Sequence, residues 1–174
     1  YAERAEIESG IKKNEAAAEA ERKKIAEIMG FTDLARVSSS MLERYRLAEL
    51  QGWKSLYSGR EFTDKQAVLD PRNALVEVDH IVPFSLILDN TLHNKALVFA
   101  EENRVKGQRV PLEYLTDPAG RKAFIKWVNK LAAEKKISRR KHQYLLLPDL
   151  HESGLLDEWK TRNINDTRYI AKYL

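Results

Sequence analysis

The part of this sequence with β-strand character is short, and most of what surrounds it has the composition of helix. Residues 75–82 are rich in Val and Ile and alternate imperfectly, which is typical of a strand. Pro83 ends this strand, because proline has no backbone N–H to donate to a ladder. A second short strand is predicted at residues 95–99, followed by a brief helix at 100–106 that Gly107 terminates. The sequence therefore predicts strand, long loop, strand and short helix inside a mostly helical α+β fold.

Two helices are predicted before this segment. Residues 1–29 are rich in Ala, Glu, Lys and Arg, with few apolar positions, so we expect a long and largely solvated helix that ends at Gly30. A second helix is expected to begin after residues 38–40, with Ser40 as its cap, because Ser40 and Glu43 have the spacing of a capping box. Gly52 is placed to end it.

Further helices are predicted after the segment. Asp117 and Pro118 form a cap and first-turn pair, and Ser138 is placed to cap a shorter helix. The first of these helices has an apolar stripe on one face and lysines four residues apart on the opposite face: Phe124, Trp127, Val128 and Leu131 against Lys122, Lys126 and Lys130. Residues 155–174 are also expected to be helical, with a break near 163–165.

Length and composition exclude several classes of protein. The 174 residues suit one domain with helical extensions, and no apolar run is long enough to span a bilayer. The chain has no cysteine, which excludes disulfides, a cysteine nucleophile and cysteine-ligated zinc. The net charge is only +4, but residues 101–145 hold twelve Lys and Arg against five Asp and Glu, a local excess of +7. A basic segment of this kind is what a phosphate-binding face needs, although a solvated helix surface has the same composition.

The residues best suited to chemistry lie around the first predicted strand. Asp79 and His80 are adjacent at its end, and Asn94 and Asn103 follow on the second strand and the short helix. Thirteen residues separate His80 from Asn94, and eight separate Asn94 from Asn103. Asp and Asn supply the oxygen ligands that magnesium or manganese prefers. A histidine that takes a proton from water beside such a metal is sufficient for phosphodiester hydrolysis.

These residues carry a family resemblance. His80, Asn94 and Asn103 on strand, loop, strand and helix resemble the HNH, or ββα-metal, nuclease motif, with Asn as the last letter where many members have His. The segments around them are similar to the HNH domain of type II CRISPR effector nucleases, the Cas-nine enzymes, and most closely suggest a compact, type II-C-like member. These segments are residues 78–85, Asp89, 94–98 and 102–107, with the flanking segments 56–61 and 165–170.

The resemblance implies a role for each matching residue. His80 would be the general base, and Asp79 and Asn103 would hold one Mg²⁺ ion, for which Mn²⁺ could substitute. Asn94 would brace the loop rather than touch the metal. Because there is no Cys-x-x-Cys pair, no structural zinc is expected. Four basic residues near the motif are candidates for nucleic-acid contacts: Lys95, Arg104, Lys106 and Arg109.

The resemblance also implies a domain organisation. Residues 1–40 would form an N-terminal linker helix region, 41–150 the HNH nuclease domain with its ββα core at about 75–107, and 151–174 a linker leading back toward a RuvC-like nuclease domain. The expected partners are the rest of that effector and the guide RNA–target DNA heteroduplex, of which this domain would cut the strand paired to the guide. We expect a monomer in a prokaryotic cytoplasm, without a membrane partner.

Two other functions fit the same residues. The chain could be a free-standing HNH DNA endonuclease with its own DNA-binding surface. It could also be a non-catalytic nucleic-acid-binding module of the same fold, although such a module would not need Asp79, His80 and Asn103 together.

Overall fold

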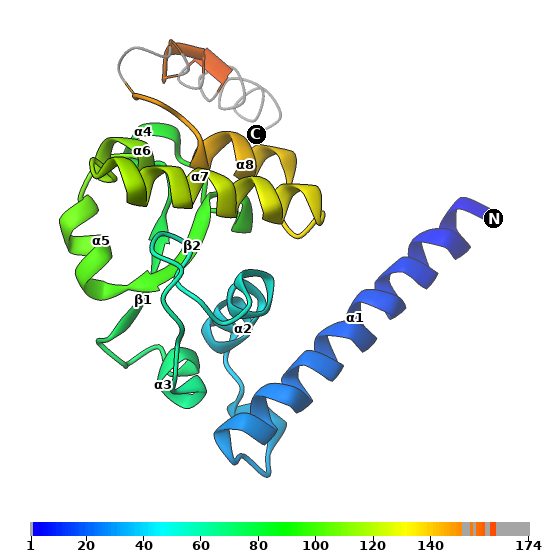
Figure 1. Cartoon of the computed structure of the whole chain (residues 1–174). Helices are drawn as coiled ribbons and strands as arrows, with labels where there is room; N and C mark the ends of the chain where they lie inside the picture. The colour runs from blue at the N-terminus through cyan, green and yellow to red at the C-terminus, as the bar shows by residue number, and fades with distance from the viewer. Residues whose placement is uncertain (1, 151–153, 155, 159–160, 163–174) are drawn as a thin grey trace.

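A computed structural model of the chain describes residues 2–150, 154, 156–158 and 161–162, and it has the expected mostly helical α+β architecture (Figure 1). The predicted linker at 151–174 and the helix expected at 155–174 lie largely outside the described residues. The helices are α1 (Ala2–Met29), α2 (Ser39–Gln51), α3 (Lys65–Leu69), α4 (Phe84–Ile87), α5 (Ala100–Lys106), α6 (Pro111–Tyr114), α7 (Pro118–Ala133) and α8 (Arg139–Leu145). Two 3₁₀ turns, η1 (Leu34–Arg36) and η2 (Leu92–Asn94), and two strands, β1 (Val76–His80) and β2 (Lys95–Phe99), complete the described elements.

The two strands form one antiparallel hairpin with a long connection. Their register pairs Val76 with Phe99 at one end and His80 with Lys95 at the other. The bounds predicted for the second strand and for α5 are confirmed. The first strand is shorter than predicted, because the Ile81 N–H donates to the Asn94 carbonyl (2.9 Å), and Asn94 already belongs to the turn η2. The partner chain therefore leaves the ladder after the His80–Lys95 pair.

The N-terminus of α2 differs from the prediction. Ser38, rather than Ser40, is the cap, and its hydroxyl accepts a hydrogen bond from the Met41 N–H at 3.2 Å. Three consecutive serines offer the same capping chemistry, and the fold uses the first of them. The helix ends at Gly52 as predicted, in a left-handed conformation (φ 65°) that glycine adopts without steric cost.

The caps predicted for the two later helices are confirmed. The Asp117 carboxylate accepts from the Gly120 N–H at 2.7 Å at the start of α7, and the Ser138 hydroxyl accepts from the Lys141 N–H at 3.1 Å at the start of α8. The short helices α3, α4 and α6 were not predicted. Each has only four or five residues, too few for a helical pattern to stand out from the surrounding turns.

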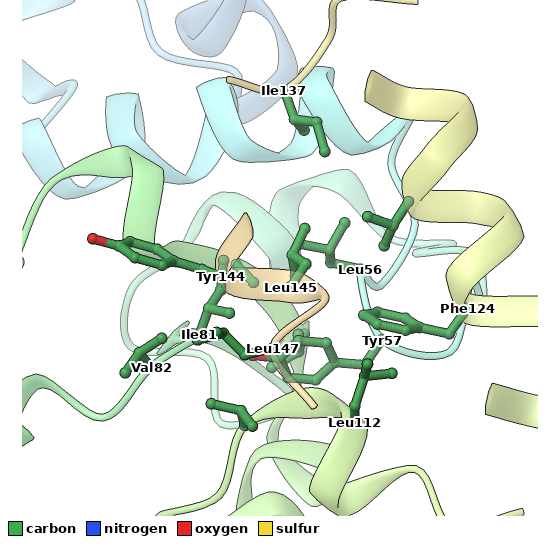
Figure 2. Close-up of a cluster of buried hydrophobic side chains, with 14 of the residues drawn as sticks. Leu56, Tyr57, Ile81, Val82, Leu112, Phe124, Ile137, Tyr144, Leu145 and Leu147 are labelled. Carbon is green, nitrogen blue, oxygen red and sulfur yellow. The ribbon is translucent and has the colours of Figure 1, made fainter. Parts of the chain in front are cut away.

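The core consists of three buried apolar clusters. The largest joins the end of β1 and the turn before Gly59 to α6, α7 and α8, and Figure 2 shows Tyr57 beside Phe124 and Leu112 within it. A second cluster joins the C-terminal end of α1 to α2 and α3, and a third packs α2 against the hairpin. The hairpin is thus covered from both sides, which holds the end of β1 in a fixed place.

Helix α1 packs through its last turns only. Ile25 and Ala26 are buried against α2, whereas the side chains described between Glu6 and Ala17 are exposed. Figure 1 shows this first part of the helix extending away from the rest of the chain. Among the described residues, no helix combines the length and the hydropathy that a membrane crossing requires.

Candidate active site

The candidate site is built on one face of β1 and the face of α5 that packs against it. Successive residues of a strand point to opposite faces, so Glu77 and Asp79 share the face toward α5. Asn103 and Lys106 are three residues apart on α5 and therefore share one side of the helix. Asn103 donates through Nδ2 to Glu77 Oε2 at 2.7 Å, and Lys106 Nζ lies 2.9 Å from Asp79 Oδ2. Both of these side-chain contacts connect the strand to the helix.

Asp79 is only 8% exposed, and one of its two carboxylate oxygens contacts two neighbouring side chains. Asp79 Oδ2 accepts a hydrogen bond from the Tyr57 hydroxyl at 2.6 Å in addition to the contact with Lys106. Oδ1 has no hydrogen-bond partner among the described residues. Asp79 is therefore held in a fixed orientation while one carboxylate oxygen stays available.

The contacts of Asn103 orient its amide in the same way. Because Nδ2 donates to Glu77, the amide oxygen points away from that contact and remains available as an acceptor or ligand. Asn103 is half-buried on α5. The site therefore offers one carboxylate oxygen and one amide oxygen, held by the strand and the helix respectively.

His80 ends β1 beside this pair. Its ring is half-buried, and Nε2 lies 3.0 Å from Asn90 Oδ1. The exposed ring of Phe84 lies with its centroid 5.3 Å from that of His80, at 38°. The His80 carbonyl accepts a hydrogen bond from Lys106 Nζ at 3.0 Å, so the same lysine contacts the backbone of His80 and the side chain of Asp79.

Asn94 is completely buried and does not join these side chains. Its Oδ1 accepts from the Val82 N–H at 2.9 Å, and its Nδ2 donates to the carbonyls of Val82 (2.9 Å) and Asp89 (3.0 Å). All of its side-chain bonds are thus to backbone. They tie the end of the loop after α4 to the residues that follow β1.

The four basic residues expected to contact nucleic acid occupy different environments. Lys106 is 1% exposed, and Lys95 is ion-paired with Glu43 of α2, so neither presents a free ammonium group to solvent. Arg104 is exposed beside Asn103. Arg109 is also exposed, although its guanidinium donates to the carbonyls of Lys106 and Val105. In this conformation, only Arg104 and Arg109 lie at the surface.

Burial changes the ionisation of two side chains that contact Asp79. Removal from water lowers the pKa of Lys106, and the charge of Asp79 opposes that shift only in part. Burial and the nearby Asp79 carboxylate raise the pKa of the Tyr57 hydroxyl well above its usual range. Tyr57 therefore keeps its proton and acts as a hydrogen-bond donor to Asp79.

Three residues of the site were not identified from the sequence. Glu77 could have been found, because it lies two positions before Asp79 on the same predicted strand face. Tyr57 belongs to a turn segment already singled out, but nothing in the sequence indicates that its hydroxyl reaches Asp79. No sequence pattern around Asn90 indicates a role in the site, since its contact with His80 depends on the path of a loop.

The available oxygens suit a hard divalent cation. No group of three or more His, Asp or Glu that could hold a metal occurs within the part of the chain that the structure describes. Asp79 and Asn103 would instead supply two oxygens, and magnesium commonly takes one or two protein oxygens and completes its shell with water and phosphate. A histidine beside such a pair can accept a proton from water, so the arrangement suits hydrolysis of a phosphate ester.

Comparisons with known proteins agree with this chemistry. Residues 55–112 match the model of an HNH endonuclease family. The chain is 36% identical over 137 residues to the CRISPR-associated endonuclease Cas9 of Staphylococcus aureus, covering 76% of this chain and 13% of that protein. It is 32% identical over 130 residues to Cas9 1 of Streptococcus thermophilus, covering 74% of this chain and 11% of that protein. The chain thus corresponds to about an eighth of the length of these relatives.

A solved structure is similar over almost the whole chain. A crystal structure of Streptococcus thermophilus Cas9 in complex with the AGGA PAM superposes with a TM-score of 0.69 at 27% identity, covering 98% of this chain and 16% of that one. The similarity extends well beyond the segment matched by the family model and includes the flanking helices.

Proposed function

Because this chain belongs to the HNH endonuclease family and is homologous to the HNH domain of Cas9 endonucleases, we propose that it is the nuclease domain that cuts the DNA strand paired to a guide RNA. The observation that supports this proposal most strongly is that the candidate metal ligands and the candidate base lie together at the end of β1. Asp79 on β1 and Asn103 on the adjoining helix α5 each have one oxygen available, and His80 is the next residue after Asp79 on the strand.

The roles of the side chains follow from their contacts. HNH nucleases generally depend on a divalent metal, and we propose that Asp79 and Asn103 hold it, with Mg²⁺ as the natural ion and Mn²⁺ as a substitute. When bound, the metal stabilises the negative charge that develops on the phosphate. His80 takes a proton from the attacking water as general base. Tyr57 and Glu77 keep the carboxylate of Asp79 and the amide of Asn103 in their orientations.

Lys106 has a structural part in this proposal. Its buried ammonium group balances the charge of Asp79 and also binds the His80 carbonyl, so it connects the metal-binding residue to the backbone of the base. Arg104 and Arg109 are exposed near the site and are the residues we propose to contact the DNA backbone. We assign no phosphate contact to Lys95 or Lys106 in this conformation, because each is committed to an acidic partner.

The proposed partners belong to a larger enzyme. The relatives are named as CRISPR-associated endonucleases, and in RNA-guided effectors base pairing to the guide supplies sequence specificity. The nuclease domain then needs to recognise backbone and geometry only, so this chain would require no base-reading surface of its own. We propose the guide RNA–target DNA heteroduplex as its substrate and a RuvC-like domain of the same enzyme as its neighbour.

A strand-resolved cleavage assay tests this function. In the complete endonuclease that contains this chain, loaded with guide RNA and given Mg²⁺, His80→Ala is expected to slow cutting of the guide-paired strand by at least about 100-fold, the usual contribution of a general base. Guide-directed binding and cutting of the other strand should be unchanged. His142→Ala is the matched control, since His142 on α8 contacts Asn129 of α7 and lies outside the proposed site.

Two results would overturn the proposal. Cutting of the guide-paired strand at the wild-type rate by His80→Ala would exclude His80 as the base. Efficient nicking of plasmid DNA by the 174-residue chain alone, with Mg²⁺ and no guide, would instead favour a free-standing endonuclease.

A further inference from the structure

Asn90 is the only described side chain that forms a hydrogen bond with the His80 ring. Asn90 lies on the exposed loop between α4 and η2, and its Oδ1 is 3.0 Å from His80 Nε2. None of the roles proposed above involves Asn90. The contact is not a consequence of sequence proximity, because nine residues, including helix α4, lie between His80 and Asn90 along the chain.

This contact selects one form of the neutral imidazole. An amide oxygen can only accept a hydrogen bond, so His80 Nε2 must carry the proton that it donates to Asn90. A neutral ring has a single N–H, and Nδ1 is then the nitrogen with a free lone pair. No described residue forms a hydrogen bond with Nδ1. The nitrogen that can accept a proton from water is therefore the one that Asn90 leaves free.

The loop that carries Asn90 is fixed on both sides of it. Asp89 Oδ1 accepts from the N–H and the hydroxyl of Thr91 at 2.9 and 2.6 Å, which closes a local turn around Asn90. Asp89 Oδ2 accepts from the Tyr144 hydroxyl of α8 at 2.9 Å, and the Asp89 carbonyl accepts from Asn94 Nδ2 at 3.0 Å. The residues on both sides of Asn90 are thus fixed by hydrogen bonds. These contacts of its neighbours hold the loop in place and keep the Asn90 amide directed at His80.

We propose that Asn90 is a positioning residue for the reaction, which holds the His80 ring in the form whose Nδ1 accepts the proton from water. This inference rests on the proposed function, in which His80 is the base. A hydrogen-bonded partner on the second ring nitrogen is a common way to fix the tautomer and orientation of a functional histidine.

Two variants of Asn90 distinguish a role in positioning the His80 ring from a role in packing alone. Asn90→Leu removes the acceptor, whereas Asn90→Asp keeps an acceptor oxygen at the same place. Ring nitrogen resonances of the 174-residue chain, recorded where His80 is neutral, are expected to show the proton on Nε2 in the wild type and in Asn90→Asp. In Asn90→Leu we expect a mixture of the two tautomers. The matched control is Asn129→Leu, which removes the equivalent contact from His142 Nε2 (2.8 Å) and should leave the His80 resonances unchanged.

Cleavage by the complete endonuclease supplies the second readout. Asn90→Leu is expected to cut the guide-paired strand roughly tenfold more slowly, as for the loss of one hydrogen bond at a functional histidine. Asn90→Asp should stay within about threefold of the wild type, and Asn129→Leu should not change the rate. An Asn90→Leu variant with wild-type ring resonances and a wild-type rate would overturn the inference while leaving the function of His80 intact. Wild-type cutting by His80→Ala would overturn the proposed function itself.

Discussion

Among the residues that the structure describes, two lysines are buried, and they differ in what faces their ammonium groups. Lys106 is paired with Asp79 at 2.9 Å, whereas Lys141 on α8 is 2% exposed and donates only to the Leu92 carbonyl, at 3.1 Å. Without an acidic partner, burial lowers the pKa of Lys141 to about 7. At neutral pH, a fraction of the folded molecules therefore carry Lys141 uncharged, whereas at Lys106 the charge of Asp79 opposes part of the same lowering of the pKa.

The unpartnered lysine predicts a pH dependence of stability. The ordinary pKa of a lysine is 10.5, so between pH 7 and 10.5 the unfolded chain binds a proton at Lys141 that the folded chain does not. The free energy of unfolding should therefore rise with pH in this window, by up to about 1.4 kcal/mol per pH unit from this group. Below pH 7 both states bind the proton, so stability no longer changes with pH through this group, and the cost of burying its charge is fully present.

Urea unfolding at pH 7, 8 and 9 measures this effect. Lys141→Met should remove most of the rise with pH and should be more stable than the wild type at pH 7, because no charge has to be buried. If the free energy of unfolding rose equally with pH in the wild type and in Lys141→Met, burial of Lys141 would not lower its pKa.

The residues of the candidate site differ in how far the sequence could identify them. Asp79, His80 and Asn103 stand out because their spacing on a strand and a helix matches a known nuclease motif. The environments of Lys95 and Lys106 could not be predicted, since they depend on which acids the fold places opposite them, Glu43 and Asp79. A local sequence pattern does not contain that information.

At the scale of elements, β2 has a free edge that a side chain covers. Gln51 at the end of α2 is completely buried, and its amide mimics the backbone of a neighbouring strand. Its Oε1 accepts from the Leu97 N–H at 2.9 Å, and its Nε2 donates to the carbonyls of Leu97 and Lys54, both at 2.7 Å. This amide connects α2 to the strand that leads into α5, and so it supports the helix that carries Asn103.

Removal of the Gln51 amide should be costly. Gln51→Met keeps the length of the side chain but leaves the Leu97 N–H buried without a partner, so we expect a loss of roughly 2–3 kcal/mol in the free energy of unfolding. Gln66→Met is the matched control, because Gln66 is exposed and makes a single bond to the Ile28 carbonyl. That variant should stay within about 0.5 kcal/mol of the wild type. Similar midpoints of urea unfolding for the two variants would contradict this account of the strand edge.

Helices and strands could be predicted from the sequence where their ends are determined by neighbouring residues. The bounds of β2 and α5 and the caps Asp117 and Ser138 depend on neighbouring residues in the sequence and were predicted correctly. The end of β1 was not, because a tertiary contact from Asn94 replaces the ladder there. Short helices such as α4, with four residues, contain too few positions for a periodic pattern to appear in the sequence.

At the scale of the whole molecule, positive charge is less exposed than the sequence suggests. The basic segment at 101–145 includes Lys106 and Lys141, both of which are buried. The remaining surface charge of this segment lies mostly on α7 and on the turn and helix that follow it, and the Lys122, Lys126 and Lys130 side chains are exposed there. This distribution is compatible with a solvated helix face, and of the basic residues of this segment only Arg104 and Arg109 are exposed on α5 or directly after it.

The proposed nuclease function requires one divalent metal to bind at one place, between β1 and α5. Paramagnetic broadening by Mn²⁺, followed at every assigned resonance of the 174-residue chain, maps metal binding over the whole molecule in a single titration. Broadening is expected to begin at Asp79 and Asn103, to spread to His80, to be relieved by excess Mg²⁺, and to be lost in Asp79→Asn. Broadening that spares Asp79 and Asn103, or that persists unchanged in Asp79→Asn, would contradict a metal-dependent nuclease site and leave a nucleic-acid-binding module as the better description.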